Sequence, residues 1–259
     1  ISYMVKRDRS HPCVFSYSAG NEIIECNGSS DGYVWAKKLA DEIRKYDTTR
    51  PVTSAVCCIR DEPNPYAPDD YKQDYKKLVM LDYPDTNSSW DERTEKYMDP
   101  LDIVGYNYMF ERYAKDREKY KGRVIWGSET HALYFYDSWK AVTENPNVIG
   151  DFTWTAYANL GEAGTGRFGW GGDGVYIRGI SIADYPWRAC YQGDFDLCGN
   201  RRPQSYFREA IWKDMTAPHI FTTHPKRNGD CFSGTVWHWY DVHETWTFDE
   251  EYIGQPVKT

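Results

Sequence analysis

The sequence predicts an α/β fold built on parallel strands, and two observations carry this prediction. Short apolar segments rich in strand-forming residues alternate with segments of helical periodicity through residue 157, an order typical of parallel α/β structure. Two of the apolar segments, CVFSYSAGNE (13–22) and VIWGSE (124–129), share one pattern: each continues into small residues and reaches a terminal glutamate. In a barrel of parallel strands, catalytic side chains lie at this carboxyl end of the strands.

Between these two segments the first expected helix opens at Asp31, a suitable N-cap. Its apolar stripe consists of residues at helical spacing, Trp35, Leu39, Ile43 and Tyr46. The further strands are expected at 51–59, 102–110 and 148–157, and the further helices at 90–98, 113–120, 137–143 and 205–215. The Pro- and Asp-rich segment 60–70 is expected to be an irregular loop.

Composition excludes several classes of protein. At 259 residues the chain is long enough for one barrel or for two smaller domains. A net charge of −8 argues against nucleic-acid binding, since phosphate requires a basic face. The sequence has no run of about 18 apolar residues, so no membrane span is expected. It also lacks the G-x-G-x-x-G and G-x-x-x-x-G-K motifs of nucleotide-binding α/β proteins.

The N-terminal residues and the cysteines indicate the context of the chain. Residues 1–12 have no signal-peptide core and look like the last turn of a helix, so we expect the chain to be part of a longer one. The seven cysteines lack the spacing of a disulfide framework and are interpreted as mostly reduced thiols. This favours a cytoplasmic location, with a periplasmic or secreted location as the alternative because the N-terminus of the longer chain is absent.

The two terminal glutamates, Glu22 and Glu129, are the candidate catalytic residues. Cleavage of a glycosidic bond by paired carboxylates requires two such groups on either side of one sugar. The alternative is that each is a solvated loop carboxylate. An aromatic fraction of 17% suits carbohydrate binding, because a flat ring covers the apolar face of a sugar, although large cores and β domains use aromatic residues as well.

An ordered set of motifs resembles a known family. The segments RDRSHPCVFSYSAGNE, DIVGYNY, VIWGSET, DFTWTAYANLGEAG and DLCGNRRPQSYFREAIW are similar to the catalytic barrel of glycoside hydrolase family 2, in its β-galactosidase branch. The resemblance covers roughly residues 1–215. It implies a (β/α)8 TIM-type barrel that is incomplete here, with about strands four to eight present. The implied domains are a partial barrel at 1–217 and, at 218–259, a linker with the first strands of a following all-β domain.

The same resemblance implies the catalytic roles. Glu22 is expected to be the acid/base and Glu129 the nucleophile of a retaining mechanism. Asn21 is expected to donate to the sugar 2-hydroxyl, with an ordinary turn residue as the alternative. Strands one to three, which contribute to the sugar subsite in this family, are absent, so the fragment alone is expected to be inactive.

Four further residues are candidate substrate-binding residues. Trp154, after the last strand, is expected to form a platform under the sugar, with a core tryptophan as the alternative. Asn107 and Tyr108 end a strand, and a tyrosine there would orient the nucleophile; alternation alone does not decide between Tyr106 and Tyr108. His131 is a substrate-binding candidate for which a structural role is an equal alternative.

The expected substrate is a terminal β-D-galactoside. Glucuronidases of the family recognise the sugar carboxylate with an Asn-x-Lys pair, which residues 150–215 lack. The alternatives are another neutral β-glycosidase of the family or a catalytically inert carbohydrate-binding fragment. Glu162 is a rival carboxylate in the loop after the last strand, and Ala158 stands where relatives often carry an acidic residue.

Partners and cofactors complete these expectations. The expected partners are a small carbohydrate and the remaining domains of the parent chain, with homo-oligomerisation left open, and neither nucleic acid nor a membrane is expected. No cofactor or metal site is expected. Some relatives use Mg²⁺ near the acid/base, but this chain by itself does not support such a site.

Overall fold

The computed structural model describes residues 1–23, 30–57, 90–171, 187–213, 217–234 and 237–259. Contacts divide the chain into a first unit, residues 1–130 and 137–152, and a second unit, residues 131–136 and 153–259. The loop expected at 60–70 and the side chain of Asp31 lie outside the described part, and the domain boundary expected after residue 217 stays a prediction.

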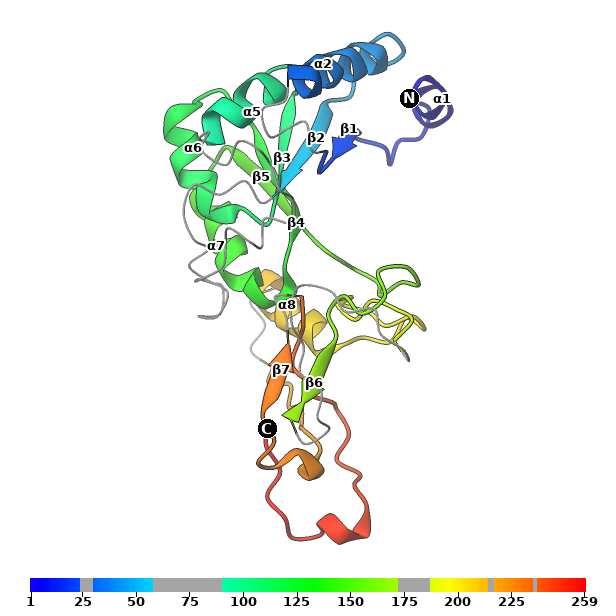
Figure 1. Cartoon of the computed structure of the whole chain (residues 1–259), viewed down its shortest axis with the longest axis vertical. Helices are drawn as coiled ribbons and strands as arrows, with labels where there is room; N and C mark the ends of the chain where they lie inside the picture. The colour runs from blue at the N-terminus through cyan, green and yellow to red at the C-terminus, as the bar shows by residue number, and fades with distance from the viewer. Residues whose placement is uncertain (24–29, 58–89, 172–186, 214–216, 235–236) are drawn as a thin grey trace. The chain divides into compact units, whose positions relative to one another are not determined.

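The first unit is built on a five-stranded sheet with the strands in chain order (Figure 1). The strands are β1 (Tyr17–Asn21), β2 (Val52–Cys57), β3 (Ile103–Asn107), β4 (Ile125–Thr130) and β5 (Val148–Thr153). The pairs β1–β2, β2–β3 and β3–β4 are parallel. Each crossover from one parallel strand to the next requires a connection of a dozen or more residues. The predicted α/β class, with parallel strands, is confirmed.

One helix precedes the first strand, the others lie between the strands in the sequence, and helices flank the sheet in Figure 1. Their bounds are α1 (Ser2–Asp8), α2 (Ser30–Arg44), α5 (Trp90–Met98), α6 (Tyr113–Lys119) and α7 (Phe135–Glu144), with 3₁₀ turns at Phe110–Arg112 and Ala132–Tyr134. The expected elements therefore exist, and most of their ends differ from prediction by one to four residues. The largest differences are at β1, which begins at Tyr17 rather than near residue 13, and at β5, which ends at Thr153 rather than near residue 157.

The buried face of α2 differs from the predicted stripe. Ala36, Ala40 and Ile43 are at most 2% exposed, whereas Trp35 is 53% exposed. The stripe drawn through the large residues was therefore wrong at its start. Small alanines face the sheet because they let the helix backbone approach closely, and Trp35 lies outside, where its ring is covered by the Lys38 ammonium at 4.9 Å.

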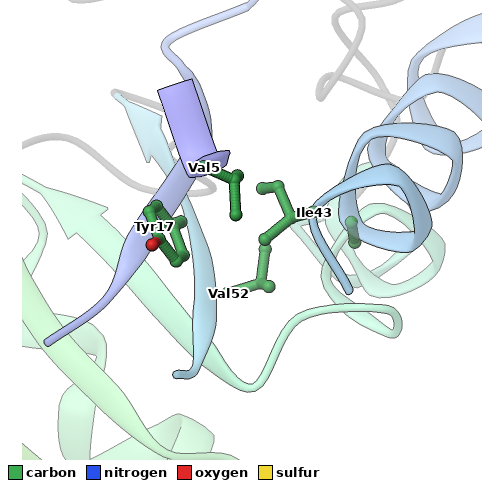
Figure 2. Packing of buried hydrophobic residues seen from close by; sticks show 5 residues of the cluster. Val5, Tyr17, Ile43 and Val52 are labelled. Carbon is green, nitrogen blue, oxygen red and sulfur yellow. The ribbon is translucent and has the colours of Figure 1, made fainter. Parts of the chain in front are cut away.

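A small core cluster joins α1 and α2 to the sheet. Val5, Tyr17, Ala40, Ile43 and Val52 are each at most 3% exposed, and in Figure 2 the side chains of Val5, Tyr17, Ile43 and Val52 point toward one another. The centre of the sheet is buried as well: every residue of β3 is buried, as are the first five residues of β2. Strands buried on both faces are typical of parallel sheets covered by helices.

The second unit carries the antiparallel part of the structure. Strand β6 (Phe168–Trp170) pairs with β7 (Phe232–Gly234), and α8 spans Pro203–Lys213. Two 3₁₀ turns lie at Pro225–Arg227 and Glu250–Tyr252. A buried ion pair anchors α8, since Arg208 Nε donates to Asp194 Oδ2 at 2.5 Å.

The first strands of an all-β domain were expected within 218–259, and its β-branched and aromatic segment 234–248 is where such strands would lie. Within its described residues the only named strand ends at Gly234, and the rest forms turns and an isolated bridge between His243 and Thr222. β-branched and aromatic residues favour a strand only where a partner completes the ladder. No helix among the described residues is long and apolar enough to cross a membrane.

We predict that Ile43→Ala lowers the free energy of unfolding by about 2–5 kcal/mol, because it leaves a cavity in the cluster of Figure 2. Val34→Ala is the matched control: it lies on the same helix and is 38% exposed, so a change within about 0.5 kcal/mol is expected. Urea denaturation of the complete gene product compares the two variants. Equal losses in both would contradict the assignment of the buried face.

Candidate active site

Three strands of the first unit bring candidate residues to one edge of the sheet. Asn21 ends β1, Asn107 ends β3, and Glu129 is the penultimate residue of β4. The register pairs Asn107 directly with Glu129. Glu22 follows Asn21, and its backbone N–H donates to Ala55 O of β2 at 3.0 Å. These are carboxyl ends of parallel strands, so the side chains meet at a shared edge.

An extra residue lies just before each glutamate. In β1, Ser18 and Asn21 are three positions apart, but their partners in β2, Thr53 and Ala55, are only two apart. In β4, Trp126 and Glu129 are likewise three positions apart, whereas their partners in β3, Gly105 and Asn107, are two apart. Such a bulge interrupts the alternation of a strand and re-aims the side chains that follow it. Both bulges contain a glycine, Gly20 or Gly127, which the sequence shows as small residues before each glutamate.

Two residues of this edge have left-handed backbone conformations. Among the described residues, Glu22 and Tyr108 are the non-glycine residues with positive φ, at 51° and 60°. A conformation of this kind costs on the order of 1–3 kcal/mol for a residue with a side chain. Both residues keep side chains that hydrogen-bond within the site, so these contacts help to hold the backbone there.

Tyr108 holds the carboxylate of Glu129. Its hydroxyl donates to Glu129 Oε2 at 2.5 Å, and its side chain is nearly buried. Burial, followed by the negative charge of Glu129, raises the pKa of Tyr108 far above its usual value. The phenol therefore stays protonated and acts as a fixed donor to the carboxylate.

Tyr106 has a different partner, which decides the choice that alternation left open. Its hydroxyl donates to Asp116, a carboxylate that is 1% exposed, and accepts from Arg123 Nη1 at 3.1 Å. The indole of Trp90 donates to the same carboxylate at 3.1 Å. Tyr106 thus belongs to a buried polar cluster with Asp116 and Arg123, and Tyr108 is the tyrosine that contacts the candidate nucleophile, Glu129.

Asn107 holds the other glutamate. Its Nδ2 donates to Glu22 Oε1 at 2.8 Å and to Asn21 Oδ1 at 3.2 Å. Its Oδ1 accepts from Ser128 Oγ at 2.6 Å. Two consecutive residues of the chain, Asn107 and Tyr108, therefore each hold one of the two glutamates.

The two carboxyl groups lie at the same site and reach solvent. Glu22 is exposed and Glu129 is half-buried. The charges of both act on the Tyr108 hydroxyl, since each raises the pKa of that group. The two glutamates, far apart in the sequence, therefore lie near the same tyrosine, and their catalytic roles stay predictions.

The remaining two candidates lie in the second unit. His131 packs its ring edge-to-face against Trp237, with centroids 4.5 Å apart. The indole N–H of Trp154 donates to Glu162 Oε2 at 3.0 Å, and Gln192 Nε2 donates to the same oxygen at 3.1 Å. The rival carboxylate Glu162 thus holds the ring of Trp154. Roles in substrate binding for His131 and Trp154 stay predictions.

Ser128 is the site residue that the sequence reasoning missed. The small residues before Glu129 were noticed as spacers, but a hydrogen-bonding role for the hydroxyl was not inferred. Gly105 makes room for it, because a Cβ at Gly105 would lie 2.5 Å from Ser128 Oγ. As for metals, the described residues contain no group of three or more His, Cys, Asp or Glu side chains that could hold an ion.

Comparison with known proteins places this geometry in a family. The model of the TIM barrel domain of glycosyl hydrolases family 2 matches residues 1–159. The chain is 24% identical to a curated protein of Bacteroides ovatus, "Beta-galactosidase BoGH2A", over 84% of this chain and 29% of that protein. The chain therefore spans less than a third of that relative's length.

Solved structures agree on the fold. A glycosyl hydrolase family 2 member from Bacteroides cellulosilyticus matches with a TM-score of 0.72 and 34% identity, over 95% of this chain and 27% of that one. A β-galacturonidase of the same family from Eisenbergiella tayi, bound to galacturonate, matches with a TM-score of 0.51 and 12% identity, over 82% and 35%. At that identity the second match supports the fold alone. The family model matches more than half of this chain, so the chain belongs to glycosyl hydrolase family 2 and carries an incomplete (β/α)8 barrel of that family.

Proposed function

We propose that the complete gene product is a retaining β-glycosidase that cleaves terminal β-D-galactosides. The observation that carries the proposal is the pair of glutamates at the carboxyl ends of β1 and β4. One is hydrogen-bonded to Asn107, the last residue of β3, and the other to Tyr108, which follows it. Two carboxyl groups in one opening are what double displacement at a sugar requires. Family membership supports the same reaction class.

Glu129 is the nucleophile in this proposal. Its carboxylate attacks the anomeric carbon, a glycosyl–enzyme bond forms, and the bond to the leaving oxygen breaks. The Tyr108 hydroxyl donates to one oxygen of this carboxylate, Oε2, and so fixes its orientation. A charge-assisted hydrogen bond of this kind also favours the ionised form of the carboxylate that must attack.

Glu22 is the acid/base. In the first step it gives its proton to the leaving oxygen, and in the second it takes a proton from the water that attacks the glycosyl–enzyme. Its exposed position suits this exchange, because the same group must meet a leaving group and then a water molecule.

The other candidates bind the sugar in this proposal. The Oδ1 of Asn21 accepts from Asn107, which orients the amide so that its N–H groups are available to the 2-hydroxyl of the sugar. Trp154 forms the apolar platform, with its ring fixed through Glu162. His131, whose ring packs against Trp237, contacts the sugar as well.

A galactoside is preferred for two reasons. The curated relative from Bacteroides ovatus is named a β-galactosidase. Residues 150–215 lack the Asn-x-Lys pair with which glucuronidases recognise a sugar carboxylate. Another neutral β-glycoside is the alternative substrate.

The first test is a panel of 4-nitrophenyl glycosides with the complete gene product. We expect the β-D-galactoside to be hydrolysed with the highest kcat/KM and α-glycosides not to be hydrolysed. A β-glucoside or β-mannoside that is hydrolysed faster would replace the galactoside as substrate. Absence of hydrolysis for every β-linked sugar would exclude the enzyme proposal and leave a carbohydrate-binding role.

The second prediction separates the roles of the two glutamates. Glu129→Gln should reduce turnover to the background on every substrate, because no glycosyl–enzyme forms. Glu22→Ala should lose about 10²–10⁴-fold on methyl β-D-galactoside yet still react with 2,4-dinitrophenyl β-D-galactoside, whose leaving group needs no proton. Added azide should restore turnover to Glu22→Ala only. Identical behaviour of the two variants with the activated substrate would show that the roles are wrongly assigned.

The third prediction concerns Tyr108. Tyr108→Phe removes the donor to Glu129 and should lower kcat/KM about 10–100-fold, as expected for a hydrogen bond to a charged group. Tyr106→Phe is the matched control, since it removes a buried phenol hydroxyl two residues away that contacts Asp116. The control should lose stability in a thermal melt and keep its kcat/KM. Equal activity losses in both variants would contradict the specific role of Tyr108.

A further inference from the structure

Both polar atoms of the Asn107 side chain are hydrogen-bonded to neighbouring residues. It has no exposed surface. On one side its Nδ2 contacts Glu22 Oε1 and Asn21 Oδ1, and on the other its Oδ1 contacts Ser128 Oγ. An amide has two donor hydrogens and one acceptor oxygen, so these three contacts use both of its ends.

The neighbours themselves decide which way the amide points. Both contacts on the first side are oxygen atoms, one from a carboxyl group and one from an amide. The amide oxygen only accepts, so it requires the NH₂ end of Asn107. The carbonyl end then faces Ser128, whose hydroxyl has to donate to it. The Ser128 hydroxyl is held close to β3 because Gly105 has no side chain in its way. Ser128 therefore fixes the orientation of Asn107.

We propose that Asn107, oriented by Ser128, determines which oxygen of Glu22 carries the acid proton and keeps that proton on Oε2. An amide NH₂ group donates and does not accept. A proton on Oε1 would face the hydrogens of Asn107, whereas an unprotonated Oε1 accepts from them whether Glu22 is neutral or ionised. The contact is thus kept throughout the reaction, and only Oε2 gains and loses the proton.

This inference rests on the proposed function and adds a division of labour between the two oxygens. In glycosylation the Oε2–H bond breaks, and its proton goes to the leaving oxygen as the glycosidic bond breaks. In deglycosylation Oε2 takes the proton of the attacking water, and the group returns to its first state. Asn107 is then a positioning residue for the acid/base, rather than the substrate contact expected from the sequence.

Loss of the Ser128 hydroxyl is expected to change which oxygen of Glu22 carries the proton. Without it, the buried Oδ1 of Asn107 has lost its donor, so amide orientations with Oδ1 toward Glu22 become populated. In those orientations Oδ1 accepts a hydrogen bond only from protonated Glu22, and the proton is then held on Oε1. Protonated Glu22 is favoured, but its proton is on the oxygen that does not reach the leaving group.

The test is the pH dependence of kcat/KM for Ser128→Ala in the complete gene product, measured with methyl and 2,4-dinitrophenyl β-D-galactoside. We expect the basic limb to move to higher pH by about 0.5–1 unit, because the acid stays protonated longer. We also expect kcat/KM at the optimum to fall about tenfold for the methyl galactoside and to stay within about twofold for the activated substrate.

Ser54→Ala is the matched control. Ser54 is 1% exposed on β2 and its hydroxyl contacts Gly20 O and Tyr97, so the variant loses a buried hydroxyl near the same edge without touching Asn107. The control should keep the wild-type pH profile. Asn107→Asp provides a second variant of the same shape, in which a carboxylate faces Glu22 and should move the basic limb upward further than Ser128→Ala does.

The outcomes separate this inference from the function on which it rests. If Glu22→Ala behaves as an acid/base variant while Ser128→Ala matches Ser54→Ala in both pH profile and substrate preference, the positioning role is excluded and the glycosidase function stands. If Glu22→Ala shows no dependence on the leaving group, the acid/base role itself is wrong and the inference falls with it. An upward shift without loss on the methyl galactoside would also overturn the assignment of the proton to Oε2.

Discussion

The site depends on strand β3, and above all on the peptide that joins its last residue, Asn107, to Tyr108. Each of these two residues holds one of the glutamates. Consecutive Cα atoms are about 3.8 Å apart, so covalent geometry limits the distance between the two anchors. The glutamates come from strands on opposite sides of β3 in the sheet order, and their placement follows from a rigid, fully buried strand rather than from flexible loops.

This placement has a cost in backbone strain that the surrounding hydrogen bonds offset. Glu22 and Tyr108 adopt left-handed conformations. At the same edge, the Glu22 carboxyl group accepts a hydrogen bond from Asn107, and the Tyr108 hydroxyl donates one to Glu129. Bulges precede both glutamates, which would otherwise follow the alternation of their strands. Strain of this kind is typical of sites that hold functional groups in one geometry.

The sequence predicted β2 and β3 well because they are short runs of β-branched, apolar and small residues, a composition that indicates a buried strand whatever its neighbours are. It predicted less well which side chains are buried and where they point, because these depend on contacts with other parts of the fold. The stripe of α2 was drawn through Trp35, although the smaller Ala36 and Ala40 face the core. Tyr106 and Tyr108 have the same parity in an alternating strand, so only the turn in the backbone at Tyr108 separates them. The Ser128 hydroxyl is aimed by a bulge, which periodicity does not reveal.

The two carboxyl groups differ in ways that suit different tasks. Glu129 is half-buried and accepts a hydrogen bond from the Tyr108 hydroxyl, whose pKa is raised far above its usual value by burial and by the charge of Glu129. Glu22 is exposed, and its Oε1 accepts a hydrogen bond from the neutral amide of Asn107. One group that stays charged and one that cycles its proton are what retaining hydrolysis demands. The asymmetry arises from the amide of Asn107, the last residue of β3, and the phenol of Tyr108, which follows it. In the proposed mechanism, the order Asn107–Tyr108 therefore underlies the different roles of the two glutamates.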